Sequence, residues 1–536
     1  MPDRPERQAD SVGEQQARPA EQPVRRIVVV GGGTAGWIVA GVLASRYPRR
    51  GEDGVEITLI ESRQQPPIGV GEGTWPTIRA TLKQIGVTET DFLRECDASF
   101  KQGSQFVNWV DGSDSDIYWH PFTLPADYAD RNLAPYWLED PRHPGFASSL
   151  CFQTELCGHA LAPKQITTPE FVGLANYAYH LDAGKFGPFL QKHCVGKLGV
   201  THVYDEIVQV QSDEQGHISH LVTKSGNPLA ADLFVDCSGF SALLIGKHLG
   251  VPFLSKKDVL FIDKAWAVQI PYRDDAAAIA SATISTAQSS GWVWDIGLTT
   301  RRGVGYVFSS NYVSDDNALE ELKTYLAARG DLSPELSFRN IGINSGYRRE
   351  FWVGNCVAVG LSAGFLEPLE ASAIVMSELS AKSIANLLPG CRGGMRHAAR
   401  IFNDTFRYRW EGIVDFLKLH YVLSRRTDSG FWVDNRRRES IPDSLREGLD
   451  YWRHHCPWHE DFSHREEVFS AASYQYVLYG MGFRTETAPW LLSDSNRSRA
   501  REAMSETARH AKALGAALPG NRDLLTRIRR YGLQKI

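Results

Sequence analysis

Residues Arg25–Gly36 read Arg-Arg-Ile-Val-Val-Val-Gly-Gly-Gly-Thr-Ala-Gly, and Trp37 follows directly. Within this stretch, the β-branched run Ile27–Val30 is typical of a parallel strand that is buried on both faces. A glycine pattern, Gly-x-Gly-x-x-Gly, separates that run from a helical pattern over Trp37–Tyr47. Strand, glycine turn and helix in this order predict a Rossmann-type βαβ unit and an α/β fold.

The glycines of this pattern have separate roles. Gly31 allows the tight turn, Gly33 lets the backbone approach a pyrophosphate, and Gly36 lets helix and strand pack closely. Thr34 and Ala35 lie where the helix N-terminus offers free N–H groups and a positive dipole end to phosphates. The stretch therefore predicts a dinucleotide site rather than a glycine-rich turn without a ligand.

Residues at the ends of three later strands extend this site. Glu61 ends the predicted strand Val55–Ile60, about 25 residues beyond the last glycine, which is near the spacing of a ribose ligand. Asp236 ends a second buried strand, and Gly360 and Leu361 follow a third. Acids and glycines in these places let the backbone approach the rest of a flavin. The sequence contains no second strand–glycine–helix unit for a nicotinamide cofactor.

Composition excludes several classes of protein. The chain has 536 residues and a net charge of −5 without a basic stripe, which argues against nucleic-acid binding. No apolar run approaches the ~18 residues that a membrane helix needs. The eight cysteines form no Cys-x-x-Cys pair and no signal peptide is recognisable, so we expect reduced thiols in the cytoplasm. Residues 1–24, rich in Gln, Glu, Arg and Pro, predict a disordered leader.

Beyond the first βαβ unit, the pattern mixes strands and helices up to residue 393 and turns mostly helical over 394–536. The Asp-, Gly- and Pro-rich stretch Val110–Ala134 predicts a long surface loop. The other segments with a clear pattern are a glycine-rich loop over Pro66–Thr74; helices from Pro76 and Thr88; a β-meander over Val203–Ala231; strands at Leu233–Asp236, Ala265–Tyr272, Trp292–Leu298, Val304–Ser309 and Asn355–Val359; and helices at Asn317–Ala328, His397–Trp410, Arg465–Tyr479 and Arg497–Ala517.

Two stretches suggest other chemistry. Gly360–Gly364 matches Gly-x-Ser-x-Gly after a strand, the nucleophile elbow of an α/β-hydrolase with Ser362 as the nucleophile. That elbow needs a helix directly behind the serine, where Pro368 would remove a donor and clash, so the hydrolase is the weaker alternative. His454–His459 followed by His464 resembles metal-ligand spacing, but no second cluster completes a tetrahedral set, and no metal is expected.

Three ionisable side chains stand in apolar or aromatic surroundings. Glu367 and Glu370 interrupt the apolar segment Phe365–Ala373, and each, if buried, needs a partner or a raised pKa. Two exposed acids at a helix start are the alternative. Lys101 is one cation among the aromatic and small polar residues of Ala98–Trp109, although a lysine is ordinarily a solvated surface group. The residues alone leave these alternatives open.

Six segments occur in the order and spacing of the flavin-dependent tryptophan halogenase family, which the chain resembles from about Arg25 to Glu370 and more loosely to Trp490. Three features indicate the family more specifically together than any one of them does alone. They are the glycine pattern, the Trp37 that directly follows it, and the Trp-x-Trp-x-Ile string at Trp292 and Trp294. The six segments are Gly31–Trp37, Gly69–Thr74, Ala98–Trp109, Val235–Phe240, Gly291–Ile296 and Phe365–Ser372.

The resemblance implies a flavoprotein-monooxygenase-like FAD-binding fold over 25–393, with Gly71 at the cofactor, and a mostly helical module over 394–536 that covers the substrate. It implies a two-component enzyme, in which a separate NAD(P)H flavin reductase supplies reduced FAD (FADH2). Oxygen then gives a flavin hydroperoxide, and bound chloride or bromide attacks it. The resulting hypohalous acid travels through a tunnel to a small aromatic substrate, which is halogenated by electrophilic substitution.

The resemblance also assigns residues by position. Lys101 matches the family's essential lysine, which holds the oxidant, and Glu370 matches its second catalytic residue, which orients the oxidant or takes the ring proton. Ser372 and Ala373 match the halide pocket, where Ala373 replaces a glycine. Trp292 and Trp294 match the family's pair of tryptophans, which prevents the flavin site from working as an ordinary monooxygenase.

Departures from the family pattern bear on the substrate. His120 and Phe122 match ring-stacking residues of the tryptophan enzymes, and Tyr474 matches one member of a tyrosine pair whose second member is Gln475 here. Gly297 replaces the motif proline. No carboxylate aligns for the amino group of free tryptophan, and burying an unpaired zwitterion is costly. We therefore expect an electron-rich aromatic substrate other than free tryptophan, such as an indole or a phenol.

A single-component flavin aromatic hydroxylase on the same fold is the nearest alternative, and NADPH oxidation without an added reductase would favour it. A non-catalytic flavin-binding protein is a further one. The sequence leaves open the regiochemistry, the halide and the oligomeric state, a homodimer included.

Overall fold

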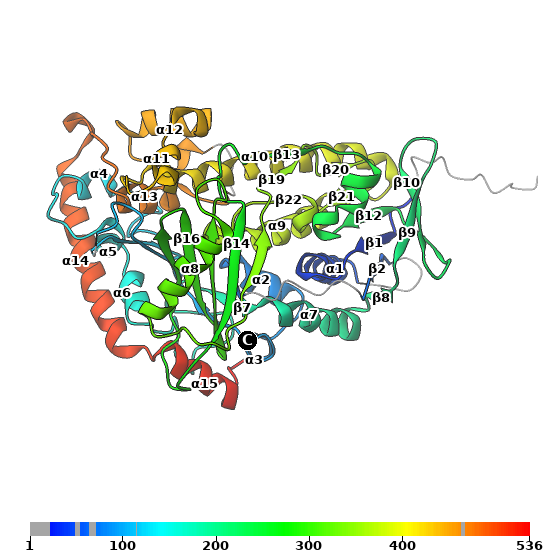
Figure 1. The fold of residues 1–536 in the computed structure, drawn as a ribbon, viewed down its shortest axis with the longest axis horizontal. Helices are drawn as coiled ribbons and strands as arrows, with labels where there is room; N and C mark the ends of the chain where they lie inside the picture. The colour runs from blue at the N-terminus through cyan, green and yellow to red at the C-terminus, as the bar shows by residue number, and fades with distance from the viewer. Residues whose placement is uncertain (1–21, 49–53, 64–70, 114, 463–466, 536) are drawn as a thin grey trace, which may run out of the picture.

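The computed structural model describes residues 22–48, 54–63, 71–113, 115–462 and 467–535. The fold is mixed α/β, as expected. In Figure 1 a mostly parallel sheet lies at the right, a larger and mostly antiparallel sheet in the middle and a group of helices at the left. Residues 1–21 of the predicted leader and 66–70 of the predicted glycine-rich loop lie outside the described residues. The last residues of the leader pack on the body, since Pro23 pairs with Cys391.

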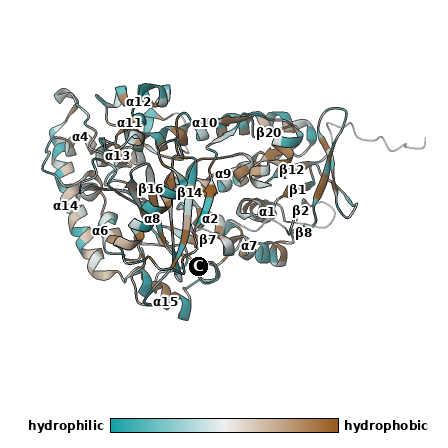
Figure 2. Cartoon of the chain, in the orientation of Figure 1, coloured by the Kyte–Doolittle hydropathy of each residue, from teal (hydrophilic) through white to brown (hydrophobic). Residues whose placement is uncertain are grey.

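The parallel sheet is built around β1 (Arg26–Val30), the first strand predicted. β1 pairs in parallel with β2 (Glu56–Glu61) and β12 (Leu233–Asp236), and Ile27–Val30 are buried. Burial on both faces explains why β1 and β12 are coloured as hydrophobic in Figure 2. The sheet order is β20-β21-β12-β1-β2-β8, with β8 at Thr201–Tyr204, β20 at Trp352–Val353 and β21 at Cys356–Ala358.

The helix after β1 begins earlier than predicted. α1 spans Thr34–Arg46 and has Gly33 as its N-cap, so the last residues of the glycine pattern already form its first turn. α1 packs against α7 (Ala183–Leu198) and α9 (Ser372–Leu387). The start of α9 is thereby held near the start of α1, although the two are more than 300 residues apart in the chain.

The antiparallel sheet contains a strand that was predicted as loop. β6 (Ile117–Pro121) lies inside the stretch Val110–Ala134 and pairs with β5 (Gly103–Val107). The loop prediction was therefore wrong at β6, because flanking Asp, Gly and Pro residues hid a short strand whose alternate residues Tyr118 and His120 are buried. The sheet order is β18-β14-β17-β16-β15-β5-β6, with β14 at Lys264–Pro271, β15 at Thr283–Gln288, β16 at Gly291–Gly297, β17 at Arg301–Phe308 and β18 at Arg339–Gly342.

The smaller elements connect these sheets. The predicted β-meander is confirmed as β9, β10 and β11, while its first residues belong to β8. The bounds are β3 Gly71–Gly73, β4 Ser99–Lys101, β7 Ala178–Asp182, β9 Ile207–Ser212, β10 Ile218–Thr223, β11 Pro228–Ala230, β13 Phe253–Ser255, β19 Gly346–Arg348, β22 Gly364–Phe365, α2 Thr77–Gln84, α3 Glu89–Glu95, α4 Ala134–Trp137, α5 Phe146–Leu150, α6 Gln153–Gly158 and α8 Asp315–Ala328.

From residue 394 onward the described chain is helical, as expected. α10 (Met395–Val422) is longer than the helix predicted at His397–Trp410. α13 (Ala471–Gly480) corresponds to the helix predicted at Arg465–Tyr479 and packs on β6. Residues 465 and 466 of that prediction lie outside the described residues. The other helices here are α11 Gly430–Asp434, α12 Asp443–Trp452, α14 Asp494–Ala517 and α15 Asn521–Tyr531. No helix in the described part of the chain is both long and apolar enough to cross a membrane.

Candidate active site

A single cavity connects the glycine pattern with the candidate catalytic residues. Its volume is about 360 Å³, and it is lined by the first turn of α1 as well as by Lys101 and Glu370. These three parts of the chain are far apart in sequence and meet only in the fold. Other predicted site residues that line the same cavity are Gly33, Thr34, Ala35, Gly71, Trp292, Trp294, Gly360, Leu361, Ser372 and Ala373.

The glycine turn leaves room for a phosphate group. Gly31 has φ +114°, and a Cβ added there would lie 2.2 Å from the Cys237 carbonyl oxygen. A Cβ at Gly36 would lie 1.9 Å from the Gly31 carbonyl oxygen, whereas one at Gly33 would meet open space. No side chain in the described part of the chain caps α1, so its first N–H groups can face this space. The turn therefore fits the pyrophosphate of a dinucleotide such as FAD.

Two strand-end acids lie near this turn with different partners. Glu61 lies beside Gly32, and its Oε1 is 2.8 Å from Nε2 of His202, a position that suits a ribose ligand. Asp236, in contrast, is fully buried, and its oxygens accept hydrogen bonds from backbone N–H groups of Leu244 and Ile245 and from two serine hydroxyls. The Asp236 carboxylate holds the loop after β12 and does not line the cavity, so its contact with the cofactor stays a prediction.

The serine of the hydrolase alternative is also used in this loop. Ser362 is buried, and its hydroxyl lies 3.1 Å from both Asp236 Oδ1 and the Gly239 carbonyl oxygen. The strand β22 follows it instead of a helix. A nucleophile elbow needs an exposed serine at the start of a helix, so the structure excludes the hydrolase.

Lys101 ends the short strand β4 and is 1% exposed. Burial lowers the pKa of its ammonium to about 8, although the nearby Glu370 carboxylate acts in the opposite direction. Its Nζ lies 5.3 Å from the centroid of the Phe122 ring, and it has no hydrogen-bond partner among the described residues. Of the two alternatives that the sequence left open for Lys101, the structure shows a cation inside a cavity rather than a solvated surface group.

Glu370 is fixed by its backbone as well as by its side chain. The residue is in the left-handed region with φ 61°, and the Trp75 indole N–H donates to its carbonyl oxygen at 2.8 Å. Oε1 is 2.7 Å from His120 Nδ1, and Oε2 accepts from the Ser104 hydroxyl at 3.3 Å. Burial alone would raise the pKa of Glu370, but the hydrogen bond and charge of His120, with the charge of Lys101, hold it below its ordinary value. The carboxylate is thus ionised at neutral pH.

Glu367 lies three residues before Glu370 in the same cavity but has only neutral neighbours on its oxygens. Its Oε2 accepts hydrogen bonds from the Trp292 indole N–H at 3.1 Å and from the Tyr421 hydroxyl, and its Oε1 has no partner among the described residues. Burial raises the pKa of Glu367 to about 7. Each of the two acids is therefore buried, as one of the sequence alternatives required.

The predicted halide residues form the start of a helix. Ser372 and Ala373 are the first two residues of α9, and none of the side chains that the structure describes caps this helix. The residue before them, Ala371, has φ 54°, so the chain turns sharply into the helix. Uncapped N–H groups and the positive helix end can hold an anion where α9 borders the cavity.

Glycines make room around the motif tryptophans. A Cβ at Gly305 of β17 would lie 2.1 Å from the Trp294 indole, so only glycine allows this ring its place in the cavity wall. Gly297, which replaces the motif proline, lies beside Ile279, and a Cβ at Gly297 would be 3.0 Å from the Ile279 side chain. A proline ring would not fit at Gly297 without a shift of its neighbours.

The predicted substrate residues divide into two groups. His120 and Phe122 lie beside Glu370 and Lys101. Tyr474 packs on Phe416 and lines a separate groove. Gln475 is buried and donates to the Pro457 carbonyl oxygen at 2.7 Å. Neither residue lines the cavity of Lys101 and Glu370, so their role in substrate binding stays a prediction.

Sequence reasoning missed four residues around Glu370: Trp75, Ser104, Tyr118 and His420. Tyr118 could have been found, because it is two residues before His120 and the period of a strand puts both on one face. His420 carries no such signal, since it lies 50 residues beyond Glu370 on another element. The histidines at 454–459 carry no metal signal in the structure, where the described residues contain no group of three or more metal-ligating side chains; His464 lies outside them.

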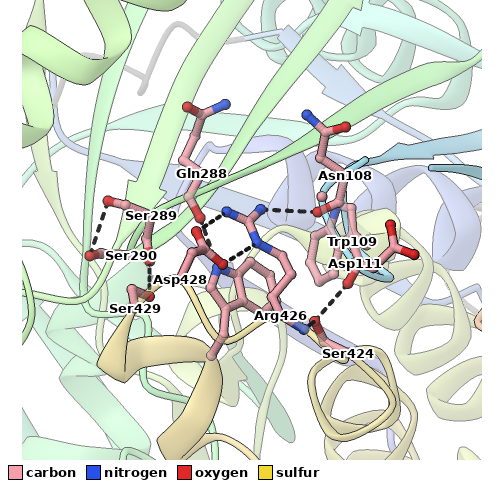
Figure 3. A network of polar contacts seen from close by, with 12 residues as sticks. Asn108, Trp109, Asp111, Gln288, Ser289, Ser290, Ser424, Arg426, Asp428 and Ser429 are labelled. Carbon is pink, nitrogen blue, oxygen red and sulfur yellow. Dashed lines mark hydrogen bonds and ion pairs between the residues drawn. The ribbon is translucent and has the colours of Figure 1, made fainter. Parts of the chain in front are cut away.

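A polar network holds the helical part against the antiparallel sheet (Figure 3). The Arg426 guanidinium donates to the Asn108 carbonyl oxygen at 3.0 Å and to both carboxylate oxygens of Asp428. The Ser424 hydroxyl donates to the Trp109 carbonyl oxygen at 2.7 Å. Because the Trp109 ring lies 6.1 Å from Trp292, this network supports the outer side of the cavity wall.

Comparisons with known proteins agree with this geometry. Residues 26–495 match the family described as tryptophan halogenase. The chain is 35% identical to the tryptophan 7-halogenase KtzQ of Kutzneria sp. (strain 744) over 495 residues, which cover 86% of this chain and 90% of KtzQ. The crystal structure of a tryptophan halogenase from Shewanella frigidimarina NCIMB 400 superimposes with a TM-score of 0.94 at 45% identity and covers 97% of this chain and 100% of that one. BrvH, a flavin-dependent halogenase from Brevundimonas sp. BAL3, superimposes with a TM-score of 0.82 at 32% identity over 94% of this chain and 99% of its own. The chain therefore belongs to the tryptophan halogenase family of flavin-dependent enzymes.

Proposed function

We propose that the protein is a two-component halogenase that uses reduced FAD, O2 and chloride or bromide to halogenate an electron-rich aromatic compound other than free tryptophan. The observation that carries the proposal is the burial of Lys101 in the cavity that also contains Glu370 and the first turn of α1. Bound reduced FAD would supply hypohalous acid from O2 and the halide. A separate NAD(P)H flavin reductase in the cytoplasm would supply the reduced cofactor.

Backbone N–H groups and side chains of the cavity would have separate roles. The N–H groups of Gly33 and the first turn of α1 would hold the phosphates, and those of Ser372 and Ala373 the halide. The Lys101 ammonium, which lacks a partner among the described residues, would donate a hydrogen bond to the oxidant and aim it. The ionised Glu370 would take the proton that the ring loses during substitution.

The surroundings of His120 support an uncharged aromatic ring as substrate. The rings of Phe416 and Tyr476 lie 5.7 and 6.1 Å from His120, and Phe122 lies beside Lys101. The Glu370 carboxylate is held by His120 and Ser104, so the amino group of free tryptophan would have to displace a partner to pair with it. Rings without added charges avoid that penalty.

Turnover of a substrate panel tests this proposal. The purified protein would be incubated with FAD, a flavin reductase, NADH and chloride or bromide, and with indole, phenol or free tryptophan, and products would be identified by mass spectrometry. We expect halogenated indole or phenol and less product from tryptophan. A clear preference for free tryptophan would refute the substrate assignment.

Lys101→Ala separates the halogenase from a hydroxylase. The variant should bind FAD like the wild type and give no halogenated product. Hydroxylated product, together with NADPH oxidation by the purified protein without a reductase, would instead identify a single-component aromatic hydroxylase.

A further inference from the structure

A second histidine lies behind the Glu370 carboxylate. His420 of α10 is fully buried, and its Nε2 is 3.6 Å from Glu370 Oε1 without a hydrogen-bond partner among the described residues. Its Nδ1 lies 2.6 Å from the Tyr118 hydroxyl. An unpartnered ring nitrogen in the interior is rare unless a ligand or a movement supplies its partner.

The surroundings decide which ring nitrogen of His420 carries the proton. Burial raises the pKa of Tyr118 well above 10, so its hydroxyl keeps its proton and can donate to Nδ1. Burial also lowers the pKa of His420 to about 3, which keeps the ring neutral. If Nδ1 accepts from Tyr118, the single proton of the ring is on Nε2 and points toward Glu370.

We propose that His420 is a positioning residue for Glu370, and that its Nε2–H binds Oε1 when His120 turns from this oxygen to an aromatic substrate. His120 now holds Oε1 at 2.7 Å and is also the proposed stacking partner of the substrate ring. If the His120 ring rotates to stack on the substrate, its Nδ1 leaves Oε1 and this hydrogen bond is lost. The inference rests on the proposed role of Glu370 as the proton acceptor.

Other groups around Glu370 do not replace His420 in this role. Lys101 faces Glu370 from β4 as a cation, and Ser104 faces its other oxygen, Oε2, from β5. The next acid, Glu367, faces Tyr421 and Trp292 rather than His420. The Asp116 carboxylate contributes to the raised pKa of Tyr118, and the aromatic side chains Phe106, Trp109 and Phe416 also contact the His420 ring.

Two variants at His420 separate positioning from packing. His420→Phe keeps a ring without an N–H, and we expect kcat for halogenation to fall about 10- to 100-fold, the equivalent of one hydrogen bond to a charged group, with KM nearly unchanged. His420→Gln can place an N–H near the position of Nε2 and should recover part of the loss. The acid limb of the pH–kcat profile should move to higher pH in His420→Phe, because Glu370 loses a partner of its ionised form.

His193→Gln is the matched control, because His193 is a buried histidine of α7 whose Nε2 contacts the Ile85 carbonyl oxygen away from the cavity. Its kcat and pH profile should stay at the wild-type values. An unchanged kcat and pH profile in His420→Phe, with an active wild type, would overturn the positioning role alone. A wild type that halogenates none of the panel compounds would instead overturn the proposed function.

The tautomer of His420 can be measured without substrate or cofactor. In ¹⁵N-histidine NMR spectra, with the His420 signals assigned by their shift in Tyr118→Phe, we expect a neutral Nε2–H ring from pH 5 to 8. Tyr118→Phe should allow the Nδ1–H tautomer to appear. An Nδ1–H or positively charged ring in the wild type would overturn the proposal even if the His420 variants do not fold.

Discussion

Glu367 and Glu370 are three residues apart, buried in the same cavity, and yet have opposite electrostatic surroundings. Glu370 faces side chains that carry or can accept positive charge, and its pKa is held below the ordinary value. Glu367 receives hydrogen bonds only from the indole of Trp292 and the hydroxyl of Tyr421, and burial raises its pKa to about 7. Pairs of acids whose surroundings separate their pKa values commonly have separate roles.

The difference in pKa indicates that Glu370 is the acid that accepts a proton and that Glu367 holds the cavity wall. An ionised Glu370 beside Lys101 is ready to accept a proton at neutral pH. Glu367 keeps Trp292 in place and exchanges its own proton near pH 7. The predictions below test this division.

The largest expected effect is the fall in kcat when Glu370 is replaced. Glu370→Gln removes the proton acceptor and should lower kcat for halogenation by about 10²–10⁴-fold. Glu367→Gln keeps an oxygen for Trp292 and Tyr421 and should lower kcat by less than about tenfold, the scale of one neutral hydrogen bond. Both are measured by product formation with saturating reduced FAD. Equal losses in the two variants would show that the acids share one role.

The pH dependence of kcat should reflect Lys101 and Glu370. As pH rises through about 8, the Lys101 ammonium loses its proton and its positive charge, so kcat should fall on the alkaline side. On the acid side, kcat should fall only below pH 4.5, since the pKa of Glu370 lies below that value. A pH–kcat profile measures both limbs; a plateau that extends beyond pH 9.5 would contradict a catalytic ammonium.

Glu367 should affect the pH dependence of stability. Its pKa is raised from 4.5 to about 7 in the folded state, so between these values the folded protein binds more protons than the unfolded chain. Its contribution to stability is therefore present below pH 4.5 and is lost as pH rises through 7. Glu367→Gln removes this dependence and should be more stable than the wild type by about 1–3 kcal/mol at pH 8, with little difference at pH 5. Urea unfolding at both pH values measures it, and a variant that is less stable at pH 8 would contradict the raised pKa.

The smallest effects are expected away from both acids. Arg426→Ala leaves the Asn108 carbonyl oxygen without its donor and should lower the free energy of unfolding by about 1–3 kcal/mol. Asp428→Asn should lower it by no more than about 1 kcal/mol, because the Asp428 side chain is half exposed. Thermal and urea unfolding compare the two variants. A tenfold loss of kcat in Asp428→Asn would show that the network of Figure 3 takes part in the chemistry.

The elements that were predicted well have a strong local signal. β1 and α1 follow from a β-branched run and three glycines, although α1 begins three residues earlier than predicted, and α14 follows from a long helical pattern. β6 was missed because its five residues lie between Asp-, Gly- and Pro-rich segments, and its pairing with β5 is what stabilises it. Gln475 was placed by alignment with the family, but its side chain lies in a core contact that no local pattern encodes.

The sequence by itself determined the dinucleotide unit and, through family motifs, the identity of Lys101 and Glu370 as candidates. These features depend on residues that are neighbours in the chain. Only the tertiary structure decided that Lys101 is buried, that Glu370 is ionised at neutral pH and that Glu367 exchanges its proton near pH 7. Burial and charge depend on side chains from β4, β6 and α10 that meet only after folding, and the pKa of a carboxyl group is set by the groups that surround it in space.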